Sequence, residues 1–294
     1  MQKKYIFVVN PISGGKDKED LRNKVLDFGK EAGIEMQVFE TSGNDDKAAL
    51  KALYKKSGAE RIIIAGGDGT IKMVAESLEN EEVVLGIIPA GSANGLSADL
   101  NFPKALDEQL KIAFFNDFVS LDMVCINDKR SLHLSDLGLN AELISNYEQS
   151  AIRGKLGYAI QAVSTLADEE VSFVVSIEAN GTVVETEAKM VVIANSQKYG
   201  TGVVINPLGK INDGKFEIVI LKDFNLGIFS KIVAGNMPFD TGEVEIISTS
   251  KAMIQSDIPV DFQIDGEYCG KESQLKIYIL PQTMKVAVPE GWNN

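Results

Sequence analysis

Short apolar runs alternate with helical periods between Lys3 and about Leu121. Apolar residues recur at helical spacing within residues 17–30, and a β-rich run at 36–39 follows. A second helical period follows Asn44, a candidate N-cap residue, and ends near Gly58. Alternating strands and helices are typical of a parallel sheet with helices on both faces. We therefore predict a doubly wound parallel-sheet domain over residues 1–121.

The pattern changes after Leu121. Strand-like runs at 171–177 and 190–193 flank the dipeptide Asn180-Gly181, which is a strong hairpin signal. One helical period, at about 155–167, interrupts these short strands. A chain of 294 residues also exceeds a typical single domain. The sequence therefore predicts a second, β-rich domain over residues 122–294.

Three loops of small residues each follow an apolar strand, so a parallel sheet would bring them to its carboxyl edge, where such sheets bind ligands. Their glycines let backbone amides approach phosphate oxygens, and Asp68 would leave a carboxylate beside a transferred group. The first loop is neither a Walker A loop nor a dinucleotide fingerprint. The pattern indicates phosphoryl transfer. The loops are Pro11-Ile12-Ser13-Gly14-Gly15-Lys16, Ala65-Gly66-Gly67-Asp68-Gly69-Thr70 and Pro89-Ala90-Gly91-Ser92-Ala93-Asn94-Gly95.

In this order, and with a late Asp265-Gly266-Glu267, the loops resemble the diacylglycerol kinase catalytic domain family, which includes bacterial lipid kinases and sphingosine kinases. The resemblance extends over the whole chain. It implies a nucleotide-binding kinase catalytic domain of the NAD kinase and diacylglycerol kinase type at 1–121. It also implies a lipid-binding β-sandwich at 122–294, with ATP in the cleft between the domains.

The resemblance also implies roles for individual residues. The resemblance implies catalytic roles for Asp68, Asp265 and Glu267. Either Asp68 or Asp265 would act as the general base. The positions that match nucleotide contacts are Asn10, Gly14, Thr41, Gly66, Gly67, Gly69, Thr70, Ser92 and Asn94.

Two departures bear on the substrate. Gly95 stands where many bacterial diacylglycerol kinases have an Asp of a magnesium–water network, and Met73 stands where the helix usually carries Glu. A small residue after Asn94 resembles sphingosine kinases. Glu142 matches an acidic residue near the lipid head group in those enzymes; the alternative is a solvated charge at a helix start.

The segment 206–215 has two interpretations. Asp213-Gly214 reads as a hairpin turn before the strand at 216–221. The resemblance instead implies a structural magnesium site, held by the Asp213 carboxylate and the main-chain carbonyls of Lys210 and Lys215, which are oxygen ligands that suit a hard cation.

The formal net charge of −13 argues against nucleic acid as a partner and against broad electrostatic adhesion to anionic lipid. No apolar run approaches the ~18 residues of a membrane span, and the first apolar run is too short for a signal peptide. We expect a cytoplasmic protein, peripheral to the membrane, with transient contact to its surface. The sequence leaves a homodimer open.

Together these features predict an ATP- and Mg²⁺-dependent lipid kinase that phosphorylates a hydroxyl of diacylglycerol or a related lipid, a step of phospholipid biosynthesis. A sphingoid base is the alternative lipid substrate. Two other functions stay open: a kinase of the NAD kinase type with a soluble substrate, and an ATP-binding module without turnover.

Overall fold

The computed structural model describes residues 2–11, 18–92, 94–138, 172–198, 204–223 and 242–293. The chain forms two compact units, residues 1–122 with 281–294, and residues 123–280. The expected division placed all of 122–294 in one domain, whereas the final segment belongs to the first unit. The helix expected at 155–167 lies outside the described residues.

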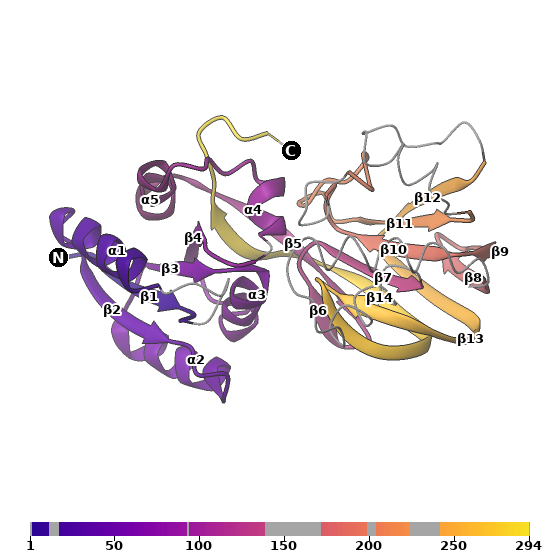
Figure 1. Cartoon of the computed structure of the whole chain (residues 1–294), viewed down its shortest axis with the longest axis horizontal. Coiled ribbons are helices and arrows are strands. Elements are labelled where there is room, and N and C mark those ends of the chain that lie inside the picture. The colour runs from indigo at the N-terminus through magenta and orange to yellow at the C-terminus, as the bar shows by residue number, and fades with distance from the viewer. Residues whose placement is uncertain are drawn as a thin grey trace. The chain divides into compact units, whose positions relative to one another are not determined.

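The first unit contains a parallel sheet (Figure 1). Strand β1 pairs in parallel with β2 on one side and β3 on the other, and β3 pairs with β4. The end of β14 runs parallel to β4, with Lys285 opposite Val84. The bounds of these strands are β1 Lys4–Val9, β2 Glu35–Glu40, β3 Arg61–Gly66, β4 Val84–Pro89 and β14 Glu267–Ala287.

Helices follow the strands in the order that the alternation predicts. Helix α2 ends at Gly58, which adopts φ 65° in the left-handed region that glycine tolerates. Arg61 donates to the carbonyl oxygens of Ala113 and Asn116, both at 2.9 Å, and so ties the end of α5 to the start of β3. The helices are α1 Glu19–Glu31, α2 Asp46–Ser57, α3 Asp68–Ser77, α4 Gly95–Asp99 and α5 Leu106–Phe115.

One face of this sheet packs against α1 and α5. Alternate residues of β1, Tyr5, Phe7 and Val9, are buried with Val25 of α1 and Phe114 of α5. The Tyr5 hydroxyl donates to the Phe114 carbonyl oxygen at 3.1 Å, and burial raises the pKa of Tyr5. Helices α2 and α3 contact each other, and α3 contacts β3. The predicted doubly wound domain is confirmed.

The second unit is built from antiparallel strands that form a β-sandwich, which confirms the rest of the predicted fold class. Strand β13 belongs to both layers, because residues 252–256 pair with β8 and residues 262–264 pair with β7. Its pairing with β14 is irregular between Gln255 and Val260. The strands are β5 Phe118–Ile126, β6 Lys129–Ser131, β7 Leu134–Gly138, β8 Phe173–Ala179, β9 Thr182–Ala188, β10 Met190–Ala194, β11 Phe216–Leu221, β12 Val244–Thr249 and β13 Lys251–Ile264.

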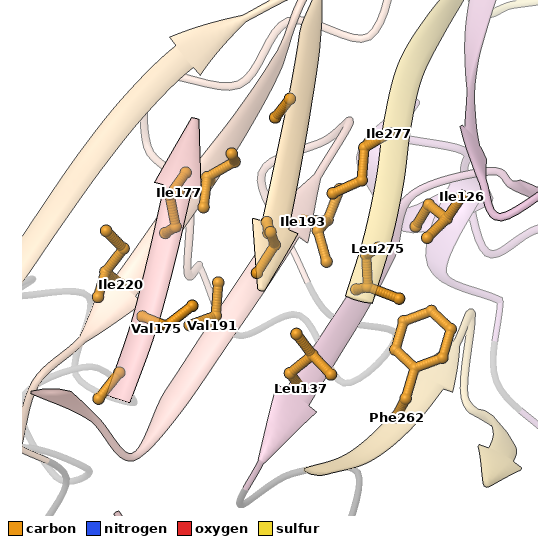
Figure 2. Packing of buried hydrophobic residues seen from close by; sticks show 14 of the residues in the cluster. Ile126, Leu137, Val175, Ile177, Val191, Ile193, Ile220, Phe262, Leu275 and Ile277 are labelled. Carbon is orange, nitrogen blue, oxygen red and sulfur yellow. The ribbon is translucent and has the colours of Figure 1, made fainter. Parts of the chain in front are cut away.

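The core of the second unit lies between these layers. Buried side chains from β7, β8, β10, β13 and β14 pack together, and Figure 2 shows Phe262 and Leu275 beside Leu137. The predicted hairpin at Asn180-Gly181 is confirmed. It joins β8 to β9, and both turn residues have positive φ, 52° and 76°, as a type I′ turn requires.

Candidate active site

The parallel sheet brings four loops to one edge of the first unit. In the pairing register, Val9 lies opposite Glu40 and Ala65, and Gly66 lies opposite Pro89. The strands therefore end at the same level, and the loops that follow them share the carboxyl edge of the sheet. This edge is where open α/β sheets bind their ligands. It carries the described candidates Asn10, Thr41, Gly67, Asp68, Gly69, Thr70, Ser92 and Asn94.

The glycines of the second loop have different roles. Gly66 is buried, and a Cβ atom there would lie 2.5 Å from Cβ of Thr70. Gly66 therefore lets the first turn of α3 pack closely on β3. Gly67 precedes that helix, and its carbonyl oxygen accepts from the amides of Thr70 and Ile71 at 3.0 and 3.1 Å. Gly69 is exposed.

Asp68 joins the second loop to the third. Its side chain is buried, with 6% exposed, and Oδ2 accepts from the amide of Gly95 at 2.7 Å. Oδ1 accepts from the amide of Leu96 at 3.1 Å. The Asp68 carboxylate, which belongs to α3, thus caps the N-terminus of the short helix α4. Gly95, where the family often has Asp, contributes to this contact through its backbone.

The third loop is closed by its own asparagine and held by two further contacts. Asn94 Oδ1 accepts from the Gly91 amide at 2.9 Å, and Nδ2 donates to the Gly91 carbonyl oxygen at 3.1 Å. Lys18 Nζ donates to the carbonyl oxygen of Ala90. The backbone amide of Ala90 in turn donates to the carbonyl oxygen of Gly66 at 2.9 Å. Ser92 is exposed at the tip. These contacts hold the described residues of the loop in place.

Asn10, the residue before the first loop, contacts the second loop. Its Nδ2 donates to Thr70 Oγ1 at 3.4 Å, and its amide donates to Ala65 O at 3.3 Å. Thr41 donates its amide to Val9 O at 3.0 Å, which places it beside the end of β1. Gly14, expected in the same loop, lies outside the described residues.

The loop after Thr41 is organised by Asp46. Burial acts to raise the pKa of its carboxyl, but hydrogen bonds from the amides of Ser42 and Gly43 and from the Ser42 hydroxyl outweigh burial and lower the pKa. The amide bonds measure 3.0 Å from Ser42 and 2.8 Å from Gly43. The carboxylate form of Asp46 therefore holds this loop folded at the edge.

Asp265 lies in the second unit, in the turn between β13 and β14, with φ 51°. Its carboxylate accepts from the Ser131 hydroxyl at 3.0 Å and from the amides of Leu132 and His133 at 2.9 and 3.0 Å. These contacts fix the segment between β6 and β7. Glu267, at the start of β14, is exposed. The catalytic roles of both residues stay predictions.

The loop at 206–215 shows the contacts of a turn. Asp213 Oδ1 accepts from the Lys215 amide at 3.1 Å, and Lys210, Asp213 and Lys215 are exposed. Across the described residues, no group of three or more His, Cys, Asp or Glu side chains could hold a metal ion. A magnesium site here stays a prediction. Glu142 lies outside the described part of the chain.

Sequence reasoning missed Lys18 and the buried pair Asp136 and Gln263. Gln263 Nε2 donates to Asp136 Oδ2 at 2.5 Å, and Gln263 Oε1 accepts from the Gly266 amide at 2.7 Å. Gln263 thereby supports the turn that holds Asp265. For this pair the available signal was a polar side chain next to apolar ones, since Gln263 stands between Phe262 and Ile264 and Asp136 precedes Leu137. Among the helices in the described ranges, none is both long and apolar enough to cross a membrane.

A sheet whose carboxyl edge gathers glycine-rich loops, followed by a β-sandwich, defines a kinase of the diacylglycerol kinase fold. The model of the diacylglycerol kinase catalytic domain matches residues 4–126, and that of the YegS C-terminal NAD kinase β-sandwich-like domain matches residues 136–288. The chain therefore belongs to the YegS/diacylglycerol kinase family of lipid kinases.

Known proteins resemble the chain over nearly its whole length. It is 25% identical over 291 residues to "Lipid kinase YegS" of Escherichia coli K12, covering 95% of each chain. It is 25% identical over 287 residues to "Probable lipid kinase YegS-like" of Citrobacter koseri, covering 94% of this chain and 93% of the relative. A diacylglycerol kinase structure from Bacillus anthracis has the same fold, with a TM-score of 0.78, 20% identity and coverage of 99% and 98%.

Proposed function

We propose that this chain uses ATP and Mg²⁺ to phosphorylate a hydroxyl of diacylglycerol or a closely related lipid, at the cytoplasmic surface of a membrane. The lipid oxygen forms a bond to the γ-phosphorus of ATP, the bond from that phosphorus to the β–γ bridging oxygen breaks, and ADP leaves. The hydroxyl proton passes to a carboxylate. The observation that carries the proposal is the Asp68 carboxylate, which joins the Gly-Gly-Asp-Gly loop to the Pro-Ala-Gly-Ser loop.

The first unit suits the phosphates of ATP. Gly67 and Gly69 carry no side chain that would block a phosphate, and the first turn of α3 offers amides and the positive end of its dipole. Asn10 and Thr70 add an amide and a hydroxyl, and Ser92 adds an exposed hydroxyl from the third loop. We assign nucleotide contact to these residues together with Gly14, Thr41 and Asn94. Gly66 acts indirectly, through helix packing.

The residues present are compatible with Mg²⁺. This ion binds through substrate phosphates, waters and one or two carboxylates, so a dedicated cluster of acids is not required. Asp68 is a carboxylate at the correct edge. When bound, the ion neutralises charge on the transferred group. Asp68 orients the two loops around that group, and its contacts to Gly95 and Leu96 keep the carboxylate in one position.

The remaining roles follow from the demands of phosphoryl transfer. Positioning and charge neutralisation dominate this reaction, and a base contributes less. We assign proton acceptance to Asp68 or Asp265, with Glu267 beside the latter. We assign the lipid head group to Glu142, and a structural Mg²⁺ away from the nucleotide to Asp213 with the carbonyl oxygens of Lys210 and Lys215.

A lipid panel tests the proposal. Purified protein is incubated with ATP, Mg²⁺ and either diacylglycerol or sphingosine in detergent micelles or NAD in solution, and products are identified by mass spectrometry. We expect phosphatidic acid to form faster than sphingosine phosphate. Phosphorylation of sphingosine alone would move the substrate to sphingoid bases. Phosphorylation of NAD alone would overturn the lipid assignment, and ATP binding without any product would indicate a module without turnover.

A further inference from the structure

The second unit contains a hollow of about 400 Å³ that no step of phosphoryl transfer uses. Its walls come from the β8–β9 hairpin around Asn180 and from the turn between β12 and β13. Its lining includes Glu178, Ser250, Lys251, Met253 and Lys276. The hollow is open to solvent, and both lysines are exposed. A hollow of this size accommodates a small ligand.

The strand register places two lysines side by side. Met253 lies opposite both Lys276 and Glu178, and Lys251 lies opposite Tyr278. Residues directly opposite, and residues two apart on one strand, share a face of a sheet. Lys251 and Lys276 are therefore diagonal neighbours on one face, about 7–8 Å apart between Cα atoms. Glu178 lies across Met253 from Lys276.

The two ammonium groups are not engaged in ion pairs within the described part of the chain, although the Glu178 carboxylate shares their face of the sheet as a diagonal neighbour of Lys251. Neither lysine forms an ion pair with a residue that the structure describes, whereas Lys222 and Lys271 pair with Glu245 and Asp261 at 3.0 and 3.4 Å. Like charges at this diagonal spacing repel each other weakly, because the side chains are in contact with water. This pair also stands out in a chain of net charge −13. A bound anion would relieve the repulsion.

The walls of the hollow are held in place by hydrogen bonds. Asn180 Nδ2 donates to Ser248 O at 2.9 Å, and Asn180 Oδ1 accepts from the Thr249 hydroxyl at 3.0 Å. Asn127 Oδ1 accepts from the Lys276 amide at 2.8 Å, which fixes the backbone below that lysine. A ligand would therefore meet a largely formed site, which lowers the entropic cost of binding.

We propose that this hollow binds a phosphomonoester. Lys251 and Lys276 hold the phosphate dianion as two point charges, and Ser250, a residue of the lining, adds a hydroxyl donor. Met253 offers an apolar floor to the carbon part of the ligand. The phosphate is supplied either by a soluble phosphomonoester or by the head group of a lipid phosphate in a membrane. Binding requires neither ATP nor phosphoryl transfer.

Two binding measurements on the full chain test the proposal and separate the sources. Calorimetry measures binding of glycerol 3-phosphate, and co-sedimentation measures binding to phosphatidylcholine vesicles with and without phosphatidic acid. The variant is Lys251→Gln with Lys276→Gln, and the matched control is Lys30→Gln on α1. Each lysine at an anionic surface contributes roughly fivefold, so the double variant should bind about 30-fold more weakly, while the control binds as wild type does.

Each outcome decides the matter. Binding to glycerol 3-phosphate that is lost in the double variant assigns a free phosphomonoester, whether or not the vesicles also bind. Binding to phosphatidic acid vesicles alone, lost in the double variant, assigns a lipid head group. Unchanged affinity in the double variant, or a wild type that binds neither probe, overturns the proposal. If the double variant unfolds, each single substitution should still weaken binding about fivefold. Kinase activity on micellar lipid should be unchanged, so failure here leaves the proposed function standing.

Discussion

The carboxylate of Asp68 accepts a 2.7 Å hydrogen bond from the amide of Gly95, 27 residues away along the chain. The contact lies in a buried environment and is doubled by the amide of Leu96 at 3.1 Å. One side chain thereby fixes the distance between two loops that we assign to ATP. Asp68 therefore has a positioning role in addition to any direct role beside the transferred phosphate.

Asp68→Asn should impair both stability and transfer. An asparagine keeps one acceptor oxygen but turns an NH₂ group toward an amide that also donates, so a buried donor loses its partner. We expect the free energy of unfolding to fall by about 1–3 kcal/mol. Transfer should fall at least about 100-fold, because small displacements of a reacting group have effects of that size.

Urea denaturation and steady-state rates check this expectation, with Asp27→Asn on the exposed face of α1 as the control. Wild-type turnover in a folded Asp68→Asn variant would show that the loops do not depend on this carboxylate.

Gly66→Ala and Gly69→Ala should affect different properties of the protein. The new Cβ at residue 66 would lie 2.5 Å from Cβ of Thr70, so the first turn of α3 must shift, and we expect a loss of about 1–3 kcal/mol in stability. Gly69 lies exposed within α3, where alanine is favoured over glycine by about 1 kcal/mol. Gly69→Ala should retain stability yet weaken ATP binding. Calorimetry with ATP and thermal melts separate the two effects, and equal melting temperatures for both variants would contradict the packing role of Gly66.

Asp46→Asn should reveal a pH-dependent contribution to stability. The pKa of Asp46 is lowered in the folded protein, because hydrogen bonds from Ser42 and Gly43 favour the carboxylate against the effect of burial. The wild type is therefore more stable than the variant above the ordinary carboxyl pKa. That advantage should disappear as the pH falls through the lowered pKa of the folded state. Urea midpoints of both proteins across the acidic range measure it, and a difference that does not change with pH would exclude this carboxylate as its source.

Asp265→Asn should destabilise the second unit. The carboxylate accepts from the Ser131 hydroxyl and from the amides of Leu132 and His133, and an asparagine cannot accept all of these bonds. We expect a loss of about 1–3 kcal/mol in the free energy of unfolding. Glu267→Gln, an exposed neighbour, serves as the matched control and should leave stability unchanged. Unaltered stability in Asp265→Asn, together with a large fall in kcat, would favour a direct catalytic role instead.

Local patterns predicted much of the fold. The helical spacing of Leu21, Val25 and Phe28 indicated α1, and the Asn180-Gly181 signal indicated the β8–β9 hairpin, because both depend on nearby residues. Helix α3 begins at Asp68, directly after the glycine pair, because the Gly67 carbonyl oxygen accepts from the amides of its first turn.

Long-range contacts could not be predicted in this way. The contact from Asp68 to Gly95 joins a side chain to a backbone amide, which has no signature of its own in the sequence. The pairing of Lys285 with Val84 depends on the chain returning to the first unit, and no local spacing encodes that return. The glycine patterns indicated a phosphate-binding site at the carboxyl edge of the sheet. The packing role of Gly66 became visible only in the structure, where a Cβ atom at this position would clash with Thr70.

The most direct test of the account is transfer of radiolabelled γ-phosphate from ATP to micellar diacylglycerol, measured in the chloroform-extractable fraction for wild type and Asp68→Asn. We predict a labelled phosphatidic acid product that requires Mg²⁺ and nearly disappears in the variant. Label that stays in the aqueous phase with every lipid tested, while a water-soluble alcohol becomes phosphorylated, would contradict the account.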